Sequence, residues 1–92
     1  FMASRYNKEV IAIAEQEGKK AGLGRLITLD VNQLELGGIY VFESFRGQGI
    51  ARNIVEFLLR QTHPFQKIYC IPFAHLVPFY QEFGFVSCEH PV

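Results

Sequence analysis

The chain has 92 residues, 49% of them hydrophobic and 14% aromatic, and its nine basic and nine acidic residues give a formal net charge of zero. This length predicts one small domain over residues 1–92, with residues 1–8 as a tail or the start of a truncated N-terminal region. Zero net charge without a long Lys/Arg run argues against nucleic acid as a partner. No stretch approaches about 18 apolar residues and no signal-peptide pattern is present, so we expect no membrane contact and a soluble, cytoplasmic protein.

The cysteines and histidines do not have the spacing of a metal site. Cys70 and Cys88 are far apart in the sequence, and neither has a metal-type spacing with His63, His75 or His90. We therefore expect two reduced, buried thiols and no bound metal.

The first half of the chain has the alternating pattern of β-strands. Residues 9–15 are rich in Val, Ile and Ala, residues 17–19 provide a turn, and residues 21–30 resume the extended pattern. Together these segments predict a β-hairpin.

A third strand is predicted over residues 34–42, after a turn at residues 31–33. Gly37 and Gly38 lie inside this strand, which indicates a β-bulge or the close approach of another backbone or of a ligand. Regular alternation places one set of large side chains on a common face: Leu34, Leu36, Tyr40 and Phe42.

The second half of the chain predicts two helices and two short strands. An amphipathic helix is expected over residues 47–62 and ends before Pro64, because the residue before a proline is disfavoured in helical conformation. A short strand at residues 67–71 is expected to run parallel to the third strand, because the helix has carried the chain back. The second helix is expected over residues 74–83 and a last strand over residues 85–89.

Gly47 and Gly49 lie between a strand and the start of a helix. The first turn of a helix has N–H groups without internal partners, and the aligned peptide dipoles place about half a positive charge there. Glycines let the backbone approach a phosphate without a Cβ in the way. This segment therefore predicts a pyrophosphate-binding turn, and Arg52 adds a cation at the helix start.

Two commoner glycine motifs do not fit this segment. Gly49 is followed by Ile50 and Ala51, so the lysine and the hydroxyl of the Walker motif are missing. Arg52 stands where the dinucleotide-binding motif needs a small residue, and 92 residues cannot hold its run of βαβ units.

The segment Arg46-Gly47-Gln48-Gly49-Ile50-Ala51 resembles the Arg/Gln-x-x-Gly-x-Gly/Ala signature of the GNAT superfamily of N-acetyltransferases, including the valine five residues upstream at Val41. A second segment, Phe79-Tyr80-Gln81-Glu82-Phe83-Gly84-Phe85, is similar to the other motif of that family, in the same order and at the same separation. The resemblance covers about residues 8–90.

The resemblance implies an α/β (α+β) fold, with a mixed, mostly antiparallel sheet, a central splayed pair of parallel strands and two helices. It also implies acetyl-CoA as cosubstrate. The backbone of Ile39, Tyr40 and Val41 would bind the pantetheine arm in the gap between the splayed strands. The pyrophosphate would be bound by the motif residues Arg46, Gly47, Gln48, Gly49, Ile50, Ala51 and Arg52.

The same resemblance implies catalytic roles in acyl transfer. Tyr80 matches the motif tyrosine that gives a proton to the departing thiolate. The usual position of the general base is Gly37 here, which leaves Glu35 and Glu43 as candidates, acting directly or through a water. The Val41 amide would support the oxyanion.

The resemblance therefore implies an N-acetyltransferase that moves an acetyl group to a primary amine by direct attack in a ternary complex. Only about eight residues precede the hairpin, where the family usually has a strand and two helices that shape the acceptor pocket. The alternatives are a non-catalytic acyl-CoA-binding module, a fragment that needs a partner to complete the acceptor site, or a homodimer. The family's usual asparagine is absent from residues 71–75, where His75 could substitute. The amine acceptor, a small molecule or a peptide, is left open.

Overall fold

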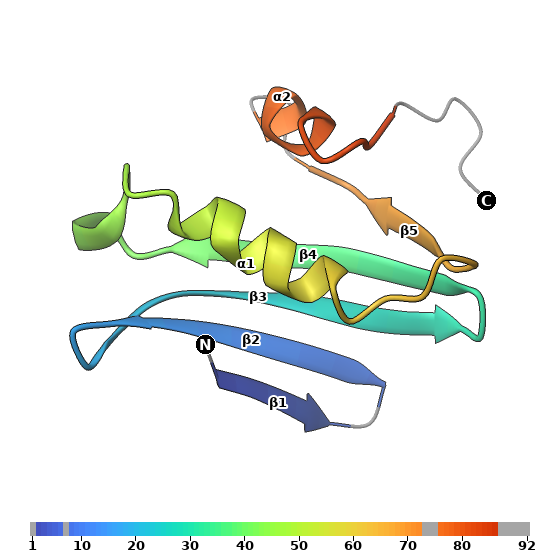
Figure 1. Cartoon of the computed structure of the whole chain (residues 1–92), viewed down its shortest axis with the longest axis horizontal. Coiled ribbons are helices and arrows are strands. Elements are labelled where there is room, and N and C mark those ends of the chain that lie inside the picture. Colours follow the sequence, from blue (N-terminus) through green and yellow to red (C-terminus); the bar gives the residue numbers. More distant parts are fainter. Residues whose placement is uncertain (1, 7, 73–75, 87–92) are drawn as a thin grey trace.

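The computed structural model describes residues 2–6, 8–72 and 76–86 of the chain, and for residues 2–6 it describes the backbone (Figure 1). The first strand, β1 (Met2–Tyr6), was not predicted from the sequence, where residues 1–8 were expected to form a tail or the start of a truncated N-terminal region. The expected last strand falls largely on residues 87–89, which lie outside the described residues together with His75, Cys88 and His90. The elements follow the chain in this order: β1 (Met2–Tyr6), β2 (Glu9–Gln16), β3 (Lys19–Asp30), β4 (Gln33–Val41), the 3-10 helix η1 (Glu43–Phe45), α1 (Ile50–Leu59), β5 (Lys67–Cys70) and α2 (Val77–Gln81).

The strands form one sheet in the order β1-β2-β3-β4-β5. The first four strands are antiparallel, whereas β5 pairs with β4 in parallel, from Gln33 opposite Lys67 to Leu36 opposite Cys70. Beyond Leu36 the remaining residues of β4 have no partner on β5, so the two strands separate. The expected mixed, mostly antiparallel sheet with a splayed parallel pair is therefore confirmed.

The helix α1 packs on one face of the sheet and supplies the centre of the core (Figure 1). Ile54, Val55 and Leu58 are fully buried. Gly22 and Gly24 of β3 lie beneath this helix, and a Cβ on Gly24 would come within 2.6 Å of the Ile54 side chain. The glycines of β3 therefore allow α1 to lie close to the sheet.

A β-bulge interrupts β4 at Gly38, whose φ of 63° lies in the left-handed region. Leu23 of β3 faces Tyr40, whereas Arg25 faces Gly37, so two residues of β4 stand opposite one residue of β3. A bulge was one of the two explanations that the sequence offered for these glycines, and the structure shows it.

The bulge reverses the faces of the sheet to which the side chains after Gly38 point. Tyr40 and Phe42 are 48% and 39% exposed, whereas Ile39 and Val41 pack against the core. The prediction that Tyr40 and Phe42 share a face with Leu34 and Leu36 is therefore wrong, because the extra residue at the bulge reverses the alternation.

Both helices are shorter than the sequence predicted. Residues Glu43–Phe45 form the 3-10 helix η1, and α1 begins only at Ile50 because Gly47 and Gly49 have φ angles of 81° and 77°. Such left-handed angles cannot continue an α-helix. Among the described residues, no helix has both the length and the apolar composition needed to cross a membrane.

Candidate functional site

The glycine turn between η1 and α1 leaves backbone N–H groups available for an anion. The first helical hydrogen bond of α1 runs from the Asn53 N–H to the Gly49 carbonyl, at 3.1 Å. The N–H groups of Ile50, Ala51 and Arg52 precede that bond and have no acceptor within the helix. No acidic side chain occupies the first turn of α1, and the space where a Cβ of Gly49 would stand is open. This geometry suits a phosphate.

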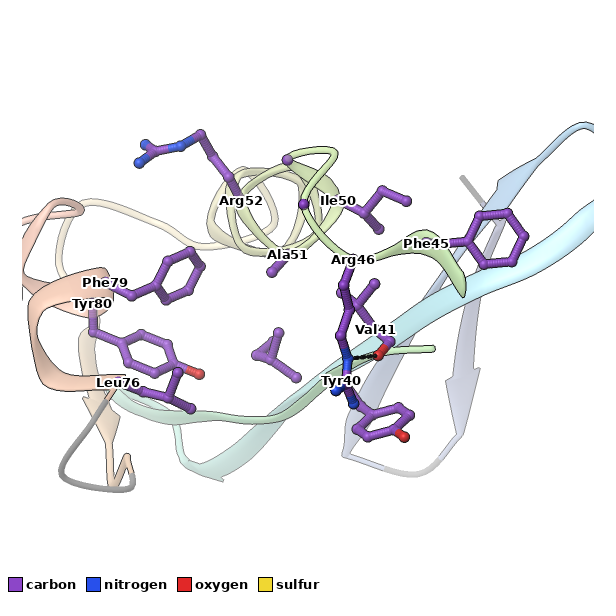
Figure 2. Close-up of a pocket in the computed structure, with 13 residues that line it drawn as sticks. Tyr40, Val41, Phe45, Arg46, Ile50, Ala51, Arg52, Leu76, Phe79 and Tyr80 are labelled. Atoms are coloured by element: carbon purple, nitrogen blue, oxygen red, sulfur yellow. Dashed lines mark hydrogen bonds between the residues drawn. The ribbon is translucent and has the colours of Figure 1, made fainter. Parts of the chain in front are cut away.

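A cavity of about 660 Å³ starts at this turn and runs between β4, α1 and α2 (Figure 2). Its walls come from three parts of the chain that are distant in sequence: the end of β4, the segment from η1 into α1, and α2. Its lining is largely apolar. The residues that line it are Ile39, Tyr40, Val41, Phe45, Arg46, Gly47, Gly49, Ile50, Ala51, Arg52, Leu76, Phe79 and Tyr80.

The residues that the sequence assigned to the coenzyme all line this cavity except Gln48. Gln48 is exposed, and its Oε1 accepts a hydrogen bond of 2.6 Å from Nε2 of Gln16, at the end of β2. The side chain of Gln48 therefore fixes the turn to the sheet, and its backbone is the part that remains for a ligand.

Arg46 ties the turn to β4. Its Nε donates a hydrogen bond of 3.0 Å to the Val41 carbonyl, and its guanidinium carbon lies 5.5 Å from the centre of the Tyr40 ring (Figure 2). Both contacts hold the side chain of Arg46 against the end of β4. Its position in the motif thus has a structural explanation, whichever ligand the cavity takes.

Arg52 extends in the opposite direction, toward α2. Its Nη2 donates to Oε1 of Glu82, and its guanidinium carbon lies 5.2 Å from the centre of the Phe83 ring. The cation predicted at the start of α1 is therefore paired with a carboxylate.

Tyr80 projects from α2 into the cavity, close to Phe79 (Figure 2). It is only 6% exposed, and its ring makes edge contacts with Phe79 and Phe85 at centroid distances of 5.1 Å and 6.0 Å. Burial raises the pKa of Tyr80 from 10.0 to about 12, and the charge and hydrogen bond of the neighbouring Cys70 side chain contribute to the same shift. The hydroxyl is therefore protonated at neutral pH, and its hydrogen bond is made with the side chain of Cys70.

Cys70, at the end of β5, is the neighbour of Tyr80 that the sequence did not point to. Its thiol is free and partly buried. Burial raises the pKa of Cys70, the hydrogen bond with Tyr80 lowers it, and the nearby carboxylate of Glu35 raises it. Its place follows from the strand register, which puts Cys70 opposite Leu36, the last residue of β4 before the two strands separate. The sequence alone does not give this register.

The two carboxylates proposed as bases do not line the cavity. Glu35 lies opposite Tyr69 on β5, on the face of β4 away from the buried Leu34 and Leu36. Glu43 is exposed in η1. The structure therefore brings Tyr80 together with the coenzyme residues and leaves both carboxylates outside this group.

Three residues that line the cavity were not predicted from the sequence as site residues: Phe45, Leu76 and Phe79. Apolar side chains carry no chemical signal of their own, although Phe79 stands in the second motif. Among the described residues, no group of three or more His, Cys, Asp and Glu side chains could hold a metal ion.

Comparison with known proteins gives a family and a fold. A family model described as an acetyltransferase (GNAT) domain matches residues 7–87. No curated protein matches the chain significantly.

Several solved structures have the same fold. Glucosamine-6-phosphate N-acetyltransferase from Arabidopsis thaliana is 22% identical with a TM-score of 0.76, and the match covers 92% of this chain and 65% of that one. A predicted acetyltransferase from Clostridium acetobutylicum, solved with acetyl-CoA, is 20% identical with a TM-score of 0.75, covering 92% and 62%. An acetyltransferase from Trypanosoma brucei is 19% identical with a TM-score of 0.76, covering 92% and 67%. The chain thus spans about two thirds of the length of these proteins.

Proposed function

The chain belongs to the GNAT acetyltransferase family, and from this premise we propose that it is an acetyl-CoA-dependent N-acetyltransferase acting on a primary amine. One observation carries the proposal. A single cavity connects the bare N–H groups of the glycine turn with the buried, protonated hydroxyl of Tyr80. A long ligand with an anionic end and a reactive thioester end fits such a cavity.

In this proposal the backbone binds most of the coenzyme. The pyrophosphate lies at the N–H groups of residues 48–52, with the positive end of α1 behind it. The pantetheine arm runs along Ile39, Tyr40 and Val41, where β4 has left β5 and a strand-like ligand can take the vacant side. The apolar side chains of Ile39 and Val41 then face the arm.

The chemical step is direct acyl transfer. The amine nitrogen attacks the thioester carbon, and the Val41 N–H stabilises the oxyanion that forms. The C–S bond then breaks, and Tyr80 donates its hydroxyl hydrogen to the departing sulfur. The attacking amine loses one proton, which passes first to Glu35 or Glu43 and then back to Tyr80. Both transfers run through water, because neither carboxylate lines the cavity. The products are the N-acetylated amine and free coenzyme A.

Thermal unfolding with acetyl-CoA, free coenzyme A and NADPH tests the coenzyme assignment. A ligand that binds only the native state must raise its melting temperature, so we expect a rise with the two coenzyme A species alone. A rise with NADPH, or with none of the three, would contradict the assignment.

Replacement of Tyr80 by phenylalanine tests the catalytic assignment. Removing a general acid lowers turnover by roughly 100-fold or more, so Tyr80→Phe should lose most thiol release with an accepted amine and keep its affinity for coenzyme A. Tyr69→Phe, a tyrosine of β5 that does not line the cavity, is the matched control and should keep wild-type turnover. Unchanged turnover in Tyr80→Phe would refute this role.

The second candidate is a non-catalytic acyl-CoA-binding module. The observation in its favour is that neither Glu35 nor Glu43 reaches the cavity. Tight coenzyme binding without thiol release over a broad panel of amines would support it against the enzyme.

A further inference from the structure

Arg52 and Glu82 join the two helices that wall the cavity. Arg52 is the third residue of α1, and Glu82 directly follows the last residue of α2. Their side chains form an ion pair, and the guanidinium of Arg52 also lies over the ring of Phe83, at 5.2 Å. We call these contacts the inter-helix ion pair.

Each of the two charges stands at a helix end that disfavours it. A cation in the first turn of α1 meets the positive end of the helix, and a carboxylate after the last turn of α2 meets the carbonyl end. Neither charge therefore stabilises its own helix. Their pairing between the two helices gives each charge a favourable partner.

The inter-helix ion pair lies close to Tyr80 along the chain. Tyr80 belongs to α2, a helix of five residues, and Glu82 is two residues further on. The C-terminal end of α2 is thus held to α1 by Glu82, while the ring of Tyr80, two residues before it, is buried. In so short a helix, the position of its end sets the direction in which Tyr80 points.

We propose that Arg52 and Glu82 are positioning residues, whose ion pair holds α2 against the first turn of α1 so that the hydroxyl of Tyr80 faces the cavity. The side chain of Arg52 acts through Tyr80, and its backbone N–H remains at the glycine turn for the anion. The catalytic consequence rests on the proposed function, whereas the structural role does not.

A double-mutant cycle tests the coupling. The variants are Arg52→Gln, Glu82→Gln and both together, with kcat and the affinity for coenzyme A measured for each. We expect each single variant to lower kcat by at most about fivefold, the limit that an exposed ion pair worth about 1 kcal/mol sets, with coenzyme affinity nearly unchanged. The double variant should be no worse than either single one, because both remove the same contact.

The opposite pattern would overturn the proposal. If Arg52→Gln weakens coenzyme binding while Glu82→Gln leaves it unchanged or tightens it, the guanidinium serves the phosphates and Glu82 only competes for it. Arg60→Gln and Glu15→Gln remove one exposed charge of each sign away from the cavity, and both should match the wild type.

A second measurement needs no enzymatic activity. In a Cys88→Ser background, a thiol reagent reports on Cys70, which lies against Tyr80. Loss of the inter-helix ion pair lets α2 move away, so Arg52→Gln and Glu82→Gln should each speed the labelling of Cys70 by about fivefold. Unchanged labelling in both would refute the positioning role. A wild type that binds no acetyl-CoA would instead refute the proposed function. The labelling of Cys70 would still test the positioning role of the inter-helix ion pair.

Discussion

Tyr80 is a weak acid even for a tyrosine. Its pKa of about 12 keeps the hydroxyl protonated throughout the neutral range. An ordinary thiol has a pKa of about 8.5, so full proton transfer from Tyr80 to a thiolate is uphill by roughly 3.5 pKa units, or about 5 kcal/mol. Under the proposed function, Tyr80 therefore acts first as a hydrogen-bond donor to the departing sulfur. The proton that it gives up is restored by the one that the amine loses.

The same residue makes stability depend on pH at the alkaline end. Folding raises the pKa of Tyr80 from 10.0 to about 12, so the folded protein holds this proton more tightly than the unfolded chain. The stabilisation is complete below about pH 10 and is lost as the pH rises toward 12. We expect urea unfolding midpoints to fall more steeply above about pH 10 in the wild type than in Tyr80→Phe.

Tyr40→Phe is the control for that experiment, because Tyr40 is 48% exposed. It should show the pH dependence of the wild type. Parallel curves for the wild type and Tyr80→Phe would mean that the hydroxyl of Tyr80 is not buried in solution.

The neighbours of Tyr80 also show where prediction from sequence stops. The two motifs predicted most of the residues that line the cavity, Tyr80 included, because spacing along the chain fixes which residues a turn or a helix presents. Cys70 and Glu82 could not be assigned, because their contacts depend on the register of β5 and on the packing of α2 against α1. Such contacts join residues that are distant in the sequence and have no local pattern.

At the scale of elements, local patterns predicted the β2–β3 hairpin, β4, α1 and β5. Each of these segments is long enough to show the spacing of apolar residues that is typical of a strand or a helix. Two features of these elements were not predicted. The start of α1 moved to Ile50 because the left-handed glycines belong to the turn, and the faces of β4 changed at the bulge. Both depend on backbone angles at single glycines, which the alternation of side chains does not encode.

The contact between β3 and β4 requires a glycine at position 22, and this requirement can be tested. A Cβ on Gly22 would lie 2.7 Å from the Tyr40 carbonyl oxygen and 3.2 Å from Cδ1 of Ile54, so a strand or α1 must shift to accept it. Overpacking of this kind costs about 1–3 kcal/mol. Gly22→Ala should therefore lower the free energy of unfolding by that amount, measured by urea denaturation.

Gly37→Ala is the matched control in the neighbouring strand, since nothing lies within 4 Å of the position of its Cβ. Its stability should stay within about 0.5 kcal/mol of the wild type. Equal destabilisation by both substitutions would indicate a general loss from alanine in these strands rather than a clash at Gly22.

At the scale of the whole molecule, the two sides of the cavity are attached differently. On one side, β4 and α1 belong to the main core with β2 and β3, where Ile54, Val55 and Leu58 are fully buried. On the other side, α2 stands beyond β5 (Figure 1) and is held by its aromatic side chains and by the inter-helix ion pair. Local opening should therefore be easiest on the side of α2.

Hydrogen exchange with and without acetyl-CoA tests this unequal attachment. A ligand that bridges the glycine turn and α2 suppresses local opening there, in addition to raising the free energy of global unfolding for every amide. We expect the largest gain in protection at residues 47–52 and in α2. A smaller gain is expected in β2, because amides paired within the sheet should exchange through global unfolding. A uniform gain would mean that α2 is as firmly held as the sheet before the ligand binds. Protection at the turn without protection in α2 would place the coenzyme on the glycine turn and leave Tyr80 out of its reach.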